Sequence, residues 1–103
     1  MSKFSIWVDA DSCPALVRDL IIRFCKRLEL DCFYVANRQI GIPKNSNFKM
    51  IVTDSTKDAA DNYIVENAQE NDIVITRDIL LAERLLEKEV TTINDRGLCF
   101  TKE

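Results

Sequence analysis

Two carboxylates, Asp9 and Asp11, follow the largely apolar run 4–8 and stand two residues apart. The run is typical of a buried strand in an α/β sheet, and side chains two positions apart in an extended chain project to the same side. Ligands of open α/β sheets gather at the carboxyl ends of the strands, so a pair of acids at that edge is suited to a divalent cation. A structural alternative exists for Asp11, because an acid or Ser12 ahead of Pro14 is also a typical helix start.

A third acid, Asp78, ends the run 72–78, which repeats the pattern of the opening stretch. The run is apolar at its centre, and a helix is predicted directly after it over residues 79–87. Asp78 is therefore expected at the same edge of the sheet as Asp9 and Asp11. Its alternative role is to cap the following helix, where a carboxylate accepts backbone N–H groups.

Two more acids, Asp58 and Asp61, head the apolar stripe of a helix predicted over residues 57–69. The stripe continues at helical spacing through Ile64 and Val65, so the two carboxylates share its face. A charge on such a face is costly unless it is paired, hydrated or bound to a metal. The alternative is that both acids simply complement the helix dipole in the first turn.

The elements that must position these acids follow from the same periodicities. The best helix pattern has apolar residues at i, i+3, i+4, i+7, i+8 and i+11 and covers residues 15–28. Strands and helices alternate, which predicts an α/β fold: a Rossmann-like, three-layer domain with a mostly parallel sheet of about five strands and helices on both faces. The remaining expected elements are strands at 32–36, 50–53 and 90–93, a breaker-rich loop at 38–48, a turn at 94–97 and a short closing strand at 98–100.

The carboxyl edge of such a sheet would gather all of these acids. Two carboxylates ~5 Å apart at an effective dielectric of ~20 repel by roughly 3 kcal/mol, so a cluster of them favours a bound cation. Ligands that are all oxygen suit Mg²⁺ or Mn²⁺. The sequence therefore predicts four residues as metal ligands and catalytic groups, with Asp58 as an additional ligand: Asp9, Asp11, Asp61 and Asp78.

Composition narrows the class of protein. The 103 residues carry a formal net charge of −3, which disfavours nucleic-acid binding by a basic face but permits an enzyme whose metal ions contact the phosphate. The chain has no histidine, so a histidine general base is excluded. No apolar run approaches ~20 residues and the N-terminus lacks the pattern of a signal peptide, so we expect a cytoplasmic protein that does not enter a membrane.

The four cysteines form no C-x-x-C pair, which predicts free and mostly buried thiols. Cys13 differs from the others because it stands near a helix N-terminus, which lowers the pKa of a thiol. The neighbouring carboxylates would oppose that effect. A zinc site without histidine would need all four thiols together.

Five motifs in this order resemble the YaiI/YqxD family of uncharacterised bacterial proteins: VDADSCP at 8–14, VAN at 35–37, DAADNYIV at 58–65, DIVITRD at 72–78 and the turn at Arg96-Gly97. The family is similar to PIN-like and NYN-like domains, Rossmann-type folds in which such acids hold Mg²⁺ or Mn²⁺ for cleavage of RNA. The resemblance implies a single PIN-like domain over residues 1–103. Members usually continue through a further helical segment, so this chain is expected to be a form truncated at its C-terminus.

A nuclease of this type would use its metal to activate a water and to neutralise the scissile phosphate. RNA is then the expected partner, and an oligomer is possible. The candidates for substrate contacts are Asn37, Arg38, Lys44, Thr76, Asn94 and Arg96. For all of these except Thr76, the simpler interpretation is an ordinary solvated loop residue.

Two other functions remain open from the sequence. The D-x-D pattern also resembles haloacid-dehalogenase-type phosphatases of small molecules, in which the first acid, here Asp9, is the nucleophile. Those families have a hydroxyl residue at the position that Cys13 occupies, which disfavours this alternative. The other possibility is a metal- or RNA-binding module without catalysis.

Overall fold

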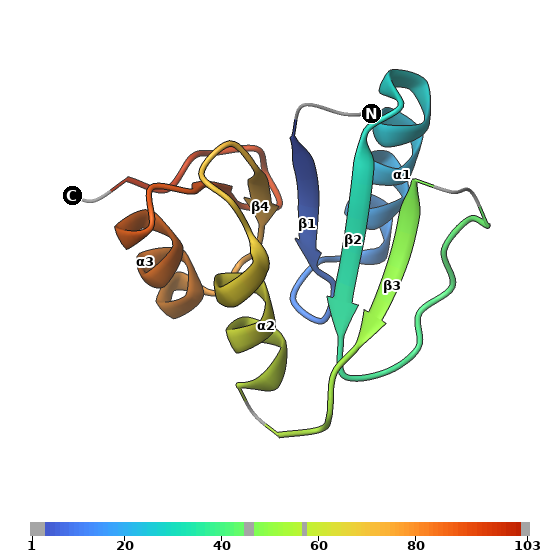
Figure 1. Ribbon diagram of the computed structural model, residues 1–103. Coiled ribbons are helices and arrows are strands. Elements are labelled where there is room, and N and C mark those ends of the chain that lie inside the picture. Colours follow the sequence, from blue (N-terminus) through green and yellow to red (C-terminus); the bar gives the residue numbers. More distant parts are fainter. Residues whose placement is uncertain (1–3, 45–46, 57, 102–103) are drawn as a thin grey trace.

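A single five-stranded sheet organises the computed structural model, which describes residues 4–44, 47–56 and 58–101 (Figure 1). The strand order is β3-β2-β1-β4-β5, and every neighbouring pair is parallel. This arrangement confirms the predicted α/β class with a parallel sheet. The strands are β1 (Ser5–Asp9), β2 (Asp31–Ala36), β3 (Phe48–Val52), β4 (Ile73–Ile75) and β5 (Thr91–Ile93).

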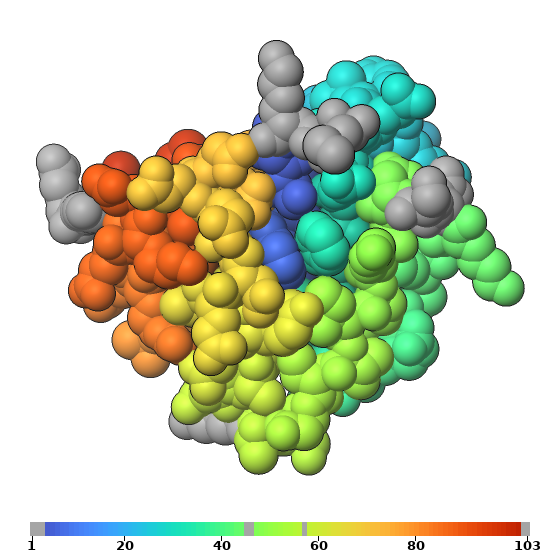
Figure 2. All heavy atoms as spheres, viewed as in Figure 1, coloured from blue at the N-terminus to red at the C-terminus, as the bar shows by residue number. Residues whose placement is uncertain are grey.

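Helices cover both faces of the sheet and complete three layers. The helix α1 (Ala15–Leu28) connects β1 to β2 and lies on one side, whereas α2 (Ala59–Asn67) and α3 (Ile79–Glu87) lie on the other (Figure 1). Figure 2 shows α2 and α3, in yellow and orange, on one flank of the molecule and β2 and β3 on the other, with β1 visible between them in blue. Each side of the sheet has its own core cluster, one around Val8 and Cys25 and the other around Val74, Ile64 and Leu81.

The boundaries of α1 and α3 match the sequence prediction, while those of β3 and α2 do not. Phe48 was expected to end a loop, but it begins β3 because its side chain is buried and its backbone pairs with Cys32. The helix α2 ends before Gln69 because the backbone N–H of that residue donates to the Asp72 carboxylate at 2.9 Å instead of continuing the helix. The predicted helix start at Lys57 lies outside the described residues.

The predicted closing strand at 98–100 is also wrong in extent. Cys99 forms a single antiparallel bridge with Ile93, and no longer ladder is present there. The segment 94–97 is a turn as predicted, and its Gly97 adopts a positive φ of 82° that favours glycine. None of the described helices is both long and apolar enough to cross a membrane.

The apolar stripe predicted on α1 is only half buried. Cys25 is 1% exposed, but Leu20, Phe24 and Leu28 are 58%, 50% and 49% exposed. Amphipathic spacing correctly identifies which face of the helix is apolar. It does not tell how much of that face the rest of the protein covers.

The thiols are free, as the sequence predicted: all four cysteines are described and form no disulfide, and Cys99 is the exposed one. Of the two opposing effects expected at Cys13, the lowering by the helix N-terminus does not prevail. Burial raises the pKa of this thiol to about 11, and the nearby Arg18 opposes that rise only in part. Cys13 is therefore a buried, protonated core residue at neutral pH.

The buried Asp72 lies just before β4, at the end of the strand opposite to the predicted acid cluster, and forms hydrogen bonds with three segments. Its carboxylate accepts hydrogen bonds from Trp7 Nε1 at 2.9 Å, from the backbone N–H of Ser5 at 2.8 Å and from that of Gln69 at 2.9 Å. Sequence analysis assigned this acid no role.

Asp72→Ala is expected to lower the free energy of unfolding by about 3 kcal/mol, because the change leaves a buried indole N–H and two backbone N–H groups without their acceptor. Urea denaturation measures the loss. The matched control is Asp19→Ala on the exposed surface of α1, which should change stability by less than about 0.5 kcal/mol. Equal losses in the two variants would contradict a structural role for Asp72.

Candidate active site

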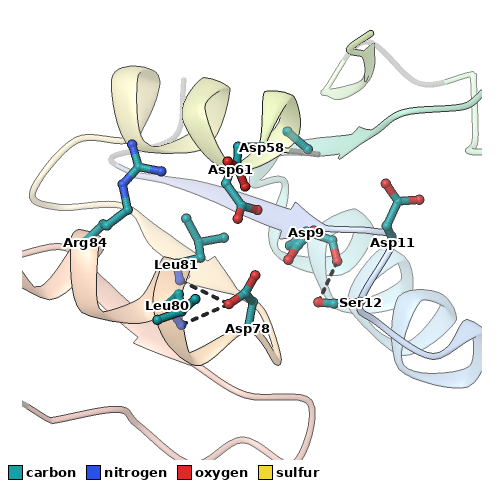
Figure 3. A pocket seen from close by; sticks show the side chains of 10 residues that line it. Asp9, Asp11, Ser12, Asp58, Asp61, Asp78, Leu80, Leu81 and Arg84 are labelled. Atoms are coloured by element: carbon teal, nitrogen blue, oxygen red, sulfur yellow. Dashed lines mark hydrogen bonds between the residues drawn. The ribbon is translucent and has the colours of Figure 1, made fainter. Parts of the chain in front are cut away.

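A pocket of about 490 Å³ opens at the carboxyl ends of β1 and β4 (Figure 3). All five acids that the sequence singled out line it, together with one arginine from α3. The lining residues are Asp9, Asp11, Ser12, Asp58, Ala60, Asp61, Asp78, Leu80, Leu81 and Arg84.

Asp9, at the end of β1, is the most buried of the five acids, with 4% of its surface exposed. Thr76 Oγ1 donates a hydrogen bond to Asp9 Oδ2 at 2.7 Å, and the backbone N–H of Asp78 donates to Thr76 Oγ1 at 3.0 Å. Burial raises the pKa of Asp9, the Thr76 hydrogen bond opposes this, and the charges of Asp78 and Asp11 add to it. The side chain is therefore held in one orientation but at an electrostatic cost.

Asp78 has both of the roles that the sequence predicted as alternatives, at the edge of the sheet and as a helix cap. It follows β4 at the edge of the sheet, and it is also the N-cap of α3, where its Oδ1 accepts hydrogen bonds from the backbone N–H groups of Leu80 at 2.9 Å and Leu81 at 3.3 Å (Figure 3). Capping occupies one carboxylate oxygen. The acid therefore has a fixed position relative to both β4 and α3.

Asp61 reaches the pocket from the first turn of α2 and faces the end of β1 (Figure 3). Its pKa is raised to about 6, chiefly by burial and in addition by the charges of Asp9 and Asp78, a hydrogen bond with the Asp78 side chain and the charge of Asp58. The three acids Asp9, Asp61 and Asp78 thus form one electrostatically coupled group. They come from three different elements.

Asp58 and Asp11 lie at the rim of the pocket and are exposed. Asp58 occupies the N-cap position of α2, but its side chain makes no capping hydrogen bond. The capping alternative for Asp11 is also wrong: the N-cap of α1 is Pro14, and Asp11 Oδ2 instead accepts a hydrogen bond from the backbone N–H of Asn37 at 3.0 Å.

Three of the predicted substrate contacts lie beside these acids. The Arg38 Nε atom is 3.8 Å from Asp11 Oδ1, and 66% of the Arg38 side chain is exposed, so the guanidinium remains accessible at the rim. Asn37 contributes its backbone N–H to Asp11. Thr76 is 1% exposed and holds Asp9 from beneath, which is a positioning role rather than a surface contact.

None of the six predicted contacts is among the residues that line the pocket itself, and this includes the other three, Lys44, Asn94 and Arg96. Asn94 has a structural role, because its Oδ1 accepts hydrogen bonds from the backbone N–H groups of Arg96 at 2.9 Å and Leu98 at 3.0 Å and so closes the turn after β5.

Sequence reasoning missed Arg84, the one cation among the described residues that line the pocket. It projects from α3, is exposed, and donates from Nη1 to Asn62 Oδ1 at 3.0 Å. Helical spacing could have found it, since Arg84 follows Leu80 by four residues and Leu81 by three and so shares their face of the helix. Ser12 was considered only as a cap, yet its Oγ accepts a hydrogen bond from the backbone N–H of Arg77 at 3.1 Å.

The pocket fits a hard divalent cation in its chemistry, because all of its anionic donors are carboxylate oxygens. As the side chains lie, however, no group of three or more acids or cysteines in residues 4–44, 47–56 and 58–101 is arranged to hold a metal ion. Burial and the charges of Asp9 and Asp78 raise the pKa of Asp61, which favours a retained proton there when no cation is present. Metal binding would require the acid side chains to rearrange.

These features define a class: a parallel α/β domain whose coupled carboxylates, on two strand ends and a helix start, line a pocket at the carboxyl edge of the sheet. The chain belongs to the YaiI/YqxD family, because the model of that family, described as an uncharacterised BCR, matches residues 7–103.

Relatives known only as UPF0178 proteins support the family assignment. The one from Treponema denticola is 49% identical over 98 residues, the one from Marinomonas sp. 45% and one from Vibrio cholerae 43%. Each match covers 95% of this chain but only 62% of the first relative and 66% of the other two, so the chain spans less than two thirds of their length. No solved structure gives a significant match.

Proposed function

We propose that this protein is a Mg²⁺- or Mn²⁺-dependent, PIN-like nuclease that cleaves RNA phosphodiesters in the cytoplasm. The observation that supports the proposal most is the coupled group of Asp9, Asp61 and Asp78 at the carboxyl edge of a parallel sheet. The resemblance to PIN-like domains points to the same acids. The free thiols agree with a reducing compartment.

The proposed roles follow from position in the pocket. Asp9, Asp61 and Asp78 would hold the cation, with Asp11 and Asp58 at the rim as direct ligands or as ligands through water. A cation bound there supplies positive charge to the scissile phosphate and lowers the pKa of a bound water. Asp61, which faces the end of β1 across the pocket (Figure 3), would also orient the attacking water.

Charge explains why the substrate would need the cation. Among the described lining residues, a phosphodiester entering the pocket meets five carboxylates and a single arginine, so without added positive charge these residues repel it. Arg84 in the lining and Arg38 beside Asp11 would contact phosphate oxygens of the RNA.

The test is cleavage of a labelled single-stranded RNA with Mn²⁺, with Mg²⁺ and with EDTA, alongside a generic phosphomonoester. Metal-dependent RNA cleavage that EDTA abolishes is the expected result. Phosphomonoester hydrolysis alone would favour the D-x-D phosphatase, although Cys13, where that family has a hydroxyl, is buried. RNA binding without cleavage would instead identify a non-catalytic module.

Arg84→Gln is expected to reduce kcat/KM for RNA by about 10- to 100-fold, because a charge-assisted hydrogen bond to phosphate contributes ~1.5 to 3 kcal/mol. Folding should be unaffected, since the side chain is exposed. Steady-state kinetics measure the effect, and Arg23→Gln on the exposed surface of α1 is the matched control. The same kcat/KM in both variants would remove Arg84 from the site.

A further inference from the structure

A second hollow, of about 300 Å³, lies on the opposite face of the sheet and is lined entirely by apolar residues. We call it the α1 groove. One wall is the exposed stripe of α1 and the other is formed by strands β4 and β5, and the residues that matter here are Leu20, Phe24, Leu28, Ile73, Ile75 and Ile93.

The groove exists because the two faces of the sheet are covered unequally. The helices α2 and α3 both lie on one face, whereas α1 is the single described helix on the other (Figure 1). Parallel sheets are normally buried on both faces, so the area over β4 and β5 beside α1 is where another layer element belongs. Phe24 at 50% exposure and Leu20 at 58% are large apolar side chains that such an element would bury.

The charges beside the groove select among possible occupants. The exposed side chains of Arg23, Lys26 and Arg27 flank the stripe, and the Arg27 guanidinium lies 5.1 Å from the centre of the Phe24 ring. A second copy of α1 would bring like charges together across the contact. An element with acidic residues beside its apolar face complements them.

The relatives are longer than this chain, and their additional residues could form the element that covers the α1 groove. More than a third of the Treponema denticola protein, and about a third of the other two, lies outside the region shared with this chain. That length exceeds what one helix of about 10 to 14 residues requires.

We propose that the α1 groove is the docking site of an amphipathic helix whose apolar face covers Leu20, Phe24 and Leu28 and whose acidic flank faces Arg23 and Arg27. In the longer relatives this helix belongs to the part of the chain outside the shared region. The site is separate from the acid pocket, so the inference does not depend on nuclease activity.

The experiment uses the unshared part of the Treponema denticola relative, produced as a separate fluorescently labelled polypeptide and titrated with this protein. Saturable binding and a rise in Tm are expected. Phe24→Ser should weaken binding about tenfold or more, whereas Leu98→Ser, which changes a similarly exposed side chain elsewhere (64%), should not. The double change Arg23→Glu and Arg27→Glu should weaken binding and reduce its dependence on salt.

Three results would overturn the proposal. One is no binding, or equal binding by the Phe24→Ser and Leu98→Ser variants. Another is self-association of the free protein in sedimentation that Phe24→Ser abolishes, which would make the occupant a second copy. The last is binding to vesicles containing phosphatidylserine that depends on Phe24, which would make the basic apolar face of α1 a lipid-binding surface.

Discussion

Asp9→Asn is expected to reduce RNA cleavage by more than about 100-fold and to abolish stabilisation by Mn²⁺, while the metal-free protein stays as stable or gains ~1 kcal/mol. Activity falls while metal-free stability does not, because Asp9 is buried beside other carboxylates and a neutral amide removes their mutual repulsion. The amide oxygen still accepts the hydrogen bond of Thr76, which preserves the local packing.

Urea melts with EDTA and with Mn²⁺ separate this result from a structural role. Wild-type protein should gain ~2.7 kcal/mol at a metal concentration a hundred times the dissociation constant. If Asp9 served only as a structural acceptor, the variant would lose ~1 to 3 kcal/mol with and without metal. Asp19→Asn, on the exposed surface of α1, is the control and should behave as wild type. A destabilised variant that keeps the full gain from metal would refute the metal-site assignment of Asp9.

The stability of the metal-free protein is expected to fall as the pH rises from about 4 to about 7, chiefly because of Asp61. The folded-state pKa of about 6 lies above the ordinary value of 3.8, so the folded protein holds this proton more tightly than the unfolded chain does. The resulting stabilisation is fully present below the pKa that Asp61 has in the unfolded chain, and it is lost as the pH rises through the pKa that Asp61 has in the folded protein. Allowing for solvent screening of a half-buried group, the loss is about 1 to 2 kcal/mol.

Asp61→Asn should therefore flatten the pH profile and raise metal-free stability at pH 7. Urea melts between pH 4 and pH 8 in EDTA measure both effects. Asp58→Asn is the comparison variant: it removes the smallest of the effects that raise the pKa of Asp61, so it should flatten the profile much less. If Asp58 is also a metal ligand, its variant should lose part of the gain from Mn²⁺. A wild-type slope in Asp61→Asn would contradict the coupling of Asp61 to the other acids.

The sequence predicted the fold class and the gathering of the five acids because both depend on local periodicity. The apolar runs before Asp9 and Asp78 mark strands whose carboxyl ends share an edge, and the spacing from Asp61 to Ile64 fixes which way that helix faces. The alternatives for individual acids needed tertiary information. Asp78 proved to be a cap as well as an edge residue, whereas Asp11 caps nothing and accepts from the loop after β2.

What the sequence could not predict depends on contacts between distant segments. The end of α2 is set by Asp72, whose carboxylate draws the backbone N–H of Gln69 out of the helical pattern. Thr76 looked like a surface residue at a strand end, yet the close approach of β4 to β1 buries it beneath Asp9. Helical spacing places Arg84 on the same face of α3 as Leu80 and Leu81, but the packing of α3 determines that this face borders the acid pocket.

The position of Trp7 has a practical consequence for all of these experiments. It is the only tryptophan of the chain, its ring stacks on Phe33 at 4.3 Å between centroids and lies 6.2 Å from that of Tyr63, and its N–H is bonded to Asp72. These partners come from β2, from α2 and from the residue before β4. The tryptophan fluorescence maximum of the protein therefore reports, without an attached dye, whether these three segments remain packed around β1.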